Sequence, residues 1–311
     1  MSSASIGIAI FPDDGNSYIS LTKNADLAMY KAKDSGRNNY QFYTNNFSIL
    51  LEKRAKIIFA LKVAIKNGNE FFLNYQPKVS IKTGKTIGLE TLVRWNSSVL
   101  GFVRPDEFIK IAEETHLILE IDHFILKQAV RDYLLLKDEG FKLEHLSINL
   151  SGVQLEFGHI VETIQNLLTE TKINPEELEL EITESYLASN MKDGIETLKM
   201  LRNLGIELAI DDFGTGYSSM SYLQKLPVTR LKVDKSFVDS LPYSADSIAV
   251  IKAILSLAEA FNLKVTVEGV EYLEQLNFFK DKYCHDIQGY VYSKPLKLED
   301  LRQFLISEQS K

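Results

Sequence analysis

The 311-residue sequence is poor in several residue types, and each shortage excludes a class of protein. Its one cysteine, Cys284, cannot form an internal disulfide and supplies no thiolate set for a metal, which is typical of a reducing compartment. No apolar run of about eighteen residues predicts a membrane segment, and no signal-peptide pattern precedes the first charges. We therefore expect a soluble chain located in the cytoplasm.

Positive charge is also in short supply. Lys and Arg number 35 against 42 Asp and Glu, which gives a formal net charge of −7. A broad basic face for a nucleic-acid polymer is therefore not expected, and a small anionic ligand would need local Lys, Arg or metal ions. The five histidines are scattered, so packing or surface roles explain them better than metal binding does.

What is present is the composition of a globular protein, with 45% hydrophobic and 25% charged residues. The length allows one large α/β domain or two smaller ones. Residues 5–11 and 39–43 are strand-like, and apolar residues recur at helical spacing between them. Because a strand, a helix and a strand cannot close a core alone, this piece is either the tail of a larger domain or a lid on the next one.

The rest of the chain predicts alternating strands and helices. A helix over 47–66 precedes two strand-like runs, 71–80 and 85–95, whose tight turn near Gly84 makes them antiparallel neighbours. Six further apolar runs follow, at 145–151, 178–184, 206–212, 230–234, 263–269 and 285–291. Helical patterns fill the gaps, at 157–171, 190–204, 216–224, 245–261 and 271–279. Eight strands in this rhythm predict a TIM-like (β/α)8 barrel, with a doubly wound open sheet as the alternative.

Polar residues stand at or near the ends of these apolar runs. They are Glu90, Asn149, Glu181, Asp211, Asp212, Lys232, Asp234, Glu268 and Gln288. In a barrel the carboxyl ends of the strands converge on one face, which carries the chemistry. Taken singly, each such residue is as readily a helix cap or a turn residue. As a set they predict a site.

The chemistry of that set points to divalent cations. Six carboxylates on one concave face repel one another unless they are neutralised, and Lys232 offsets only one charge. The donors are all oxygen, which favours Mg²⁺ or Mn²⁺ over zinc or copper. The adjacent Asp211 and Asp212 suit a two-metal centre that supports in-line displacement at phosphorus. The FGTG stretch at 213–216 lacks nucleotide-fingerprint spacing and predicts a tight loop with positive φ.

These residues carry a family resemblance. Residues from about 55 to 311 resemble the EAL-domain cyclic di-GMP phosphodiesterases, through the motifs YQPKVSIKTGKTIGLETLVRW, PDEFIKIAEET, SINLSGVQL, ELEITES, AIDDFGTGYSS, LKVDKSFV, VTVEGVE and QGYVYSKPL. Residues 5–43 resemble the C-terminal end of a GGDEF (diguanylate cyclase) domain, without its catalytic Gly-Gly-acidic loop. The resemblance therefore implies a GGDEF remnant over 1–46 without cyclase activity, and an EAL domain over 47–311.

The resemblance also assigns roles by position. It implies a modified TIM barrel with one antiparallel strand and two bound Mg²⁺ or Mn²⁺ ions. One ion would be held by Glu90, Asn149, Glu181 and Asp211, and the other by Asp211, Asp212 and Glu268, with Asp234 close by. Lys232 would contact the hydrolytic water or the phosphate, Arg94 would bind a substrate phosphate, and Gln288 would lie beside them. Glu184 would anchor the loop 213–219, and Glu271 would support the site.

The implied reaction is hydrolysis of one phosphodiester bond of cyclic di-GMP to linear pGpG, by a homodimer. Two alternatives stay open: a cyclic di-GMP receptor with weak or no catalysis and, without the resemblance, a metal-dependent barrel acting on another phosphate or enolate. Three positions depart from the family pattern, with Thr91 for alanine, His116 for glycine and Tyr272 for threonine. None of them removes a proposed ligand.

Overall fold

The computed structural model describes residues 3–157, 159–189, 191–216 and 223–309, which form two compact units. One unit comprises Met1–Lys66 with Ser97–Gly101. It contains β1 (Ile6–Ile8), α1 (Tyr18–Asp34), β2 (Tyr40–Phe42) and α2 (Asn45–Asn67), with β1 and β2 parallel. Ser17 and Ser20 form a capping box at the start of α1. The predicted strand, helix and strand are confirmed, followed by the long predicted helix.

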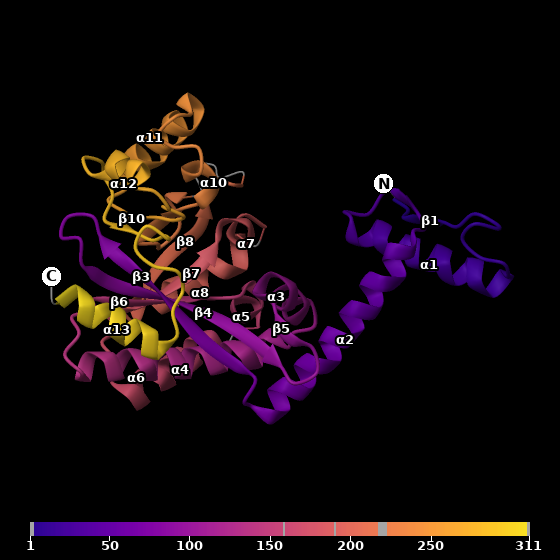
Figure 1. The fold of residues 1–311 in the computed structure, drawn as a ribbon, viewed down its shortest axis with the longest axis horizontal. Helices are drawn as coiled ribbons and strands as arrows, with labels where there is room; N and C mark the ends of the chain where they lie inside the picture. Colours follow the sequence, from indigo (N-terminus) through magenta and orange to yellow (C-terminus); the bar gives the residue numbers. More distant parts are fainter. Residues whose placement is uncertain (1–2, 158, 190, 217–222, 310–311) are drawn as a thin grey trace. The chain divides into compact units, whose positions relative to one another are not determined.

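The other unit, Asn67–Asn96 with Phe102–Lys311, is built on a closed barrel (Figure 1). Its strands are β3 (Phe71–Ser80), β4 (Thr86–Ser97), β6 (His145–Asn149), β7 (Leu178–Thr183), β8 (Glu207–Phe213), β9 (Arg230–Val233), β10 (Lys264–Val267) and β11 (Asp286–Ile287). The barrel closes because β3 pairs with both β4 and β11, and the short β5 (Gly101–Val103) adds to β4. The barrel prediction is confirmed, and the open sheet is excluded.

One barrel strand, β3, runs antiparallel to both of its neighbours. β3 is antiparallel to β4 and to β11, whereas the remaining barrel pairs are parallel. The turn between β3 and β4 contains Gly84 at φ +67°, a conformation that glycine adopts without strain. The short turn of the sequence therefore predicted the antiparallel hairpin correctly.

Helices pack on the outside of the strands (Figure 1). They are α3 (Pro105–Glu114), α4 (Ile118–Asp138), α5 (Gly152–Glu156), α6 (Ile160–Thr171), α7 (Glu184–Ser189), α8 (Met191–Asn203), α10 (Lys235–Val238), α11 (Ala245–Ala260), α12 (Leu273–Phe279) and α13 (Leu298–Gln309). Four predicted helices correspond to α6, α8, α11 and α12. The fifth, 216–224, falls mostly outside the described residues. Within the described chain, no helix has the length and apolar character needed to cross a membrane.

The barrel interior is charged, which is unusual for a fold whose centre is filled mainly by branched apolar side chains. In the stretches 178–182 and 230–233, apolar and charged residues alternate, so Leu180 and Leu231 face the helices while the charged neighbours face inward. Lys78 is fully buried and its Nζ donates to Ser147 at 2.6 Å. The apolar core therefore lies between strands and helices, and buried ion pairs fill the centre.

Candidate active site

The predicted site residues converge on one buried ammonium group, that of Lys232 on β9. Its Nζ lies 2.5 Å from Glu181 Oε2, 2.7 Å from Glu268 Oε1 and 3.0 Å from Asp211 Oδ1. Glu90 Oε2 is 3.7 Å away. Burial alone would lower the pKa of Lys232, but these four carboxylates outweigh it and raise that pKa well above its usual value. Lys232 is therefore a permanent cation at the centre of the site.

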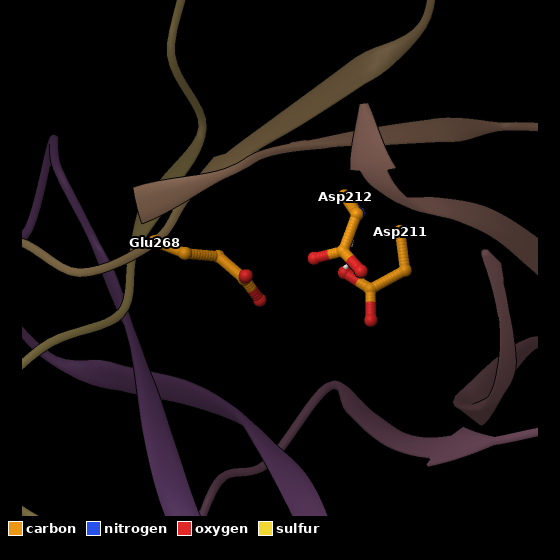
Figure 2. A group of neighbouring side chains, drawn as sticks. All are labelled: Asp211, Asp212 and Glu268. Atoms are coloured by element: carbon orange, nitrogen blue, oxygen red, sulfur yellow. Dashed lines mark hydrogen bonds between the residues drawn. The ribbon is translucent and has the colours of Figure 1, made fainter. Parts of the chain in front are cut away.

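A β-bulge explains how two adjacent aspartates can serve one site. Consecutive residues of a regular strand point to opposite faces. The register between β8 and β9 shifts between Ile210 and Phe213, and Asp212 adopts a left-handed φ of +54°. The Asp212 amide also donates to Asp211 Oδ1 at 3.0 Å. As a result, the Asp211 and Asp212 carboxylates lie side by side (Figure 2).

Asp211, Asp212 and Glu268 form a group that fits a metal ion. Each offers one carboxylate oxygen, and these oxygens all lie within 4.8 Å of one another (Figure 2). Burial and the charges of Asp211 and Asp234 raise the pKa of Asp212 to about 6. Burial and neighbouring carboxylates also raise the pKa of Glu268 well above its usual value, against the opposing effect of Lys232. A divalent cation would relieve this repulsion, and the oxygen donors suit Mg²⁺ or Mn²⁺.

The other predicted ligands lie beside this group. Glu90 accepts hydrogen bonds from Asn149 Nδ2 at 2.9 Å and from Gln288 Nε2 at 2.5 Å. Gln288 Nε2 also donates to Gln76 Oε1 at 3.0 Å. Glu90 was predicted at or near a strand end, but it lies within β4, which continues to Ser97. The long hairpin with β3 carries the strand past the barrel mouth.

The FGTG loop contacts the glutamate predicted to anchor it. Glu184 begins α7 directly after β7, and its buried carboxylate accepts a hydrogen bond from the Gly214 amide at 2.7 Å. Gly214 has φ +101°, and a Cβ there would come within 2.8 Å of the Phe237 ring. The positive φ predicted for this loop is therefore found at Gly214. The residues 217–219 of the predicted loop lie outside the described residues.

Three predicted residues have other partners. Asp234 caps α10 and accepts from the Ser236 amide at 3.0 Å, which is the helix-cap alternative. Glu271 Oε1 pairs with Lys235 Nζ at 2.6 Å. Arg94 is half-buried, and its Nη1 donates to its neighbour's carbonyl at 2.9 Å. Burial lowers the pKa of Arg94, while the nearby Glu90 and Tyr290 oppose that change.

The sequence reasoning missed two groups. Lys78 Nζ lies 2.6 Å from Glu181 Oε1 and 3.1 Å from Glu179 Oε1. It therefore offsets negative charge on the proposed metal ligand Glu181 from within the barrel. Gln76 holds Gln288, as described above. Both precede the turn on β3 at alternate positions, which places them on one face of that strand. That period-two pattern was the available signal.

A cavity of about 220 Å³ lies over these side chains. Its lining includes Glu90, Asp211, Lys232, Glu268, Gln288 and Tyr290. Acceptors, one buried cation and an exposed aromatic ring thus surround a common space. This arrangement can bind a cation and a phosphate-bearing ligand together.

Known proteins are similar to this chain in sequence. The EAL domain family model matches residues 59–295, and the diguanylate cyclase GGDEF domain model matches residues 1–39. The chain is 37% identical over 299 residues to the bifunctional diguanylate cyclase/cyclic di-GMP phosphodiesterase MucR of Pseudomonas aeruginosa, covering 96% of this chain and 44% of MucR. It is 37% identical over 302 residues to the cyclic di-GMP phosphodiesterase NbdA of the same organism, covering 97% and 38% respectively. The chain thus spans less than half the length of these relatives.

Solved structures share its fold. The MucR phosphodiesterase in complex with cyclic di-GMP superposes with a TM-score of 0.74 at 34% identity, over 79% of this chain and 99% of that one. The EAL enzyme Bd1971 with bound cAMP and cyclic di-GMP gives a TM-score of 0.76 at 30% identity, over 94% and 77%. The charged barrel mouth and the matched motifs have one common explanation: the chain belongs to the EAL domain family.

Proposed function

We propose that this chain hydrolyses cyclic di-GMP to linear pGpG with the aid of two divalent cations. The observation that carries the proposal is the convergence of Asp211, Asp212 and Glu268 beside the buried Lys232. The names of the relatives and the cyclic di-GMP complexes of the similar structures supply the substrate. We also propose the predicted boundary, with a GGDEF remnant over 1–46 and the EAL domain over 47–311.

The metal assignment follows the donor groups. Asp211, Asp212 and Glu268 would hold one Mg²⁺ or Mn²⁺ ion. The other ion would be held by Glu90, Asn149, Glu181 and the shared Asp211. Such ions neutralise charge that develops on phosphoryl oxygens and favour ionisation of water. The bulge at Asp212 keeps both aspartates on this face, and the Glu184–Gly214 hydrogen bond fixes the strand exit. This chain's residues therefore preorganise the anionic ligand set.

The remaining residues position the substrate. Because four carboxylates keep Lys232 protonated, it acts as a hydrogen-bond donor to a phosphate oxygen or to the attacking water, and not as a base. Arg94 would bind a phosphate through its guanidinium. The buried Gln288 Oε1 has no partner among the described residues, so it offers an acceptor to the substrate. Asp234 and Glu271 would support the site at its rim.

The test is a hydrolysis assay on the full chain with cyclic di-GMP and Mn²⁺ or Mg²⁺. We expect pGpG as the product and loss of turnover in EDTA. Asp211→Asn should reduce kcat at least about 100-fold, because it removes a charged oxygen shared by both proposed ion sites. The exposed Asp246→Asn makes the same chemical change on α11 and should keep wild-type turnover. Tight binding of cyclic di-GMP without turnover in either metal would instead identify a receptor.

We further propose that the chain forms a homodimer, as its family resemblance implies. Light scattering across a concentration series measures this directly. A molar mass of one chain at all concentrations would contradict it.

A further inference from the structure

Residues 149–151, where the chain leaves β6, are each tied to a different element of the barrel unit. Asn149 is the exposed last residue of β6, and its Nδ2 donates to Glu90 on β4 at 2.9 Å. The Leu150 amide donates to the carbonyl of Glu181 on β7 at 2.8 Å. Glu90 and Glu181 are both proposed metal ligands, so this segment lies beside the proposed ions.

The third contact of the segment is a hydrogen bond to helix α4. Ser151 Oγ donates to Asp122 Oδ2 at 2.7 Å. The same hydroxyl accepts from the Gln154 amide at 3.4 Å, as the N-cap of α5. Because the hydroxyl both donates and accepts, its orientation is fixed. Asp122 therefore fixes the position of Ser151, which lies two residues after Asn149.

Asp122 is a buried acid, with only 5% of its surface exposed. Burial raises its pKa to about 7, and Glu113 on α3 adds to the increase, against the hydrogen bond from Ser151. Burying a carboxyl group costs stability unless hydrogen bonds compensate for it. A carboxyl oxygen accepts the Ser151 hydrogen in either protonation state. The acceptor oxygen, and not the charge, therefore makes this contact.

Asn149 needs such support because it is exposed, so packing alone does not fix its side chain. Its Nδ2 is used by Glu90, which leaves Oδ1 for the proposed ion. Residues that orient metal ligands from behind typically change metal affinity by about 10- to 100-fold when they are mutated. The backbone that carries Asn149 is therefore a point where a distant contact can affect ion binding.

We propose that Asp122 is a positioning residue for the metal site. Through Ser151 it fixes the exit of β6 and so keeps Asn149 beside Glu90. Helix α4 packs against both β6 and α5, so the contact connects the outer helix layer with the barrel mouth. The inference rests on the proposed metal assignment and extends it to a residue outside the barrel.

Mn²⁺ binding tests this role without turnover. Electron paramagnetic resonance measures free Mn²⁺ during a titration of the full chain and gives the affinities of the two proposed ions. Asp122→Ala should weaken one of them about tenfold and leave the other within about twofold, because Asn149 is a ligand of only one proposed ion. Asp122→Asn keeps the acceptor oxygen and should bind both ions as the wild type does.

A double-mutant cycle separates positioning from a general loss of structure. Asn149→Ala should weaken the same ion, and adding Asp122→Ala should then change that affinity less than about twofold, because both changes act through one ligand. Asp132→Ala is the matched control. Asp132 is another buried acid on α4, and it accepts from the Tyr75 hydroxyl at 2.6 Å. Its loss should lower stability in urea and leave both Mn²⁺ affinities unchanged.

Ser151→Ala removes the donor at a half-buried residue and should reproduce the effect of Asp122→Ala, so it decides the matter where Asp122→Ala fails to fold. The proposal is overturned if the folded variants bind both ions as the wild type does. It is also overturned if Asp122→Ala costs as much affinity in the Asn149→Ala protein as in the wild type.

Hydrolysis of cyclic di-GMP, measured on the same samples, distinguishes the two proposals. A wild type that binds Mn²⁺ without turnover would contradict the proposed function, while the Mn²⁺ affinities of the variants would still decide the role of Asp122. A wild type that binds no Mn²⁺ would contradict the metal assignment and the positioning role together.

Discussion

At the scale of single residues, Asp212 combines two unfavourable features. Its backbone lies in the left-handed region, and its carboxylate is adjacent to that of Asp211. Left-handed backbone costs about 1–2 kcal/mol for most residues and less for Asp or Asn, whose side chains hydrogen-bond locally. Such strain and repulsion persist where the surrounding structure fixes them, and they gather at functional sites. We infer that Asp212 lowers the stability of the metal-free protein and that its carboxylate serves metal binding.

Asp212→Asn should therefore stabilise the metal-free protein and weaken metal binding. The folded pKa of about 6 exceeds the usual 3.8, so the ionised carboxylate destabilises the fold increasingly as pH rises from about 4 through 6. At pH 8 the gain should be about 1–2 kcal/mol after allowance for solvent screening, and it should be smaller at pH 5. Urea unfolding in EDTA at both pH values measures it, with Asp246→Asn as the matched control.

The same measurement repeated with saturating Mn²⁺ decides between repulsion and metal binding. The wild type should gain more stability from the ion than Asp212→Asn does, because ligand binding to the folded state stabilises it. Equal gains from Mn²⁺ in both proteins would count against Asp212 as a ligand.

At the scale of elements, the sequence predicted the order of strands and helices well but not the local irregularities. Alternation of β-branched runs with amphipathic stretches predicts the barrel, and the five-residue connection 81–85 predicts the antiparallel hairpin. The β8 bulge has no pattern of its own, since Asp211 and Asp212 continue the strand in sequence. Gln76 and Lys78 were missed because polar and charged residues at alternate positions usually indicate a solvated face. Here that face is the interior of the barrel.

Helix α6 offers an element-scale prediction at its C-terminus. Lys172 caps the helix in a left-handed conformation, with φ +56°, where glycine is the usual residue. Lys172→Gly should stabilise the barrel by about 1 kcal/mol and raise Tm by about 2–4 °C. Lys172→Ala also removes the charge but keeps the backbone strain, so it should give no gain. Both variants can be compared by thermal unfolding followed through the fluorescence of the single tryptophan, Trp95, which is buried in the barrel unit.

His116 is another non-glycine residue with a left-handed backbone. The family pattern has glycine there, and the structure gives His116 a left-handed φ of +59°. Its ring centroid lies 4.7 Å from that of Phe157 at an interplanar angle of 58°, so a tilted aromatic contact offsets part of the backbone strain. This departure from the family pattern is therefore compensated by a local contact.

At the scale of the whole barrel, buried ion pairs connect its two ends. Lys78 on β3 bridges Glu179 and Glu181 on β7, and Arg230 on β9 continues from Glu179 to Asp286 on β11. Lys232 joins the same network at the active-site end through Glu181. Strands that are distant in sequence are thus linked by ion pairs as well as by backbone hydrogen bonds. Removing one cation leaves the remaining cations to neutralise more buried carboxylates, so an excess of buried negative charge results.

Lys78→Met tests this network because Lys78 is fully buried between two carboxylates. We expect a loss of about 3–5 kcal/mol in the free energy of unfolding, measured by Trp95 fluorescence in urea. Lys137→Met removes a lysine from the partly exposed pair with Glu177 and should cost about 1 kcal/mol or less. Adding Glu179→Gln to Lys78→Met removes one negative charge from the excess that the loss of Lys78 creates, so the double variant should be more stable than the sum of the single changes predicts. Strict additivity would mean that Lys78 stabilises the barrel by packing alone, and the charges of the interior would then be energetically independent of one another.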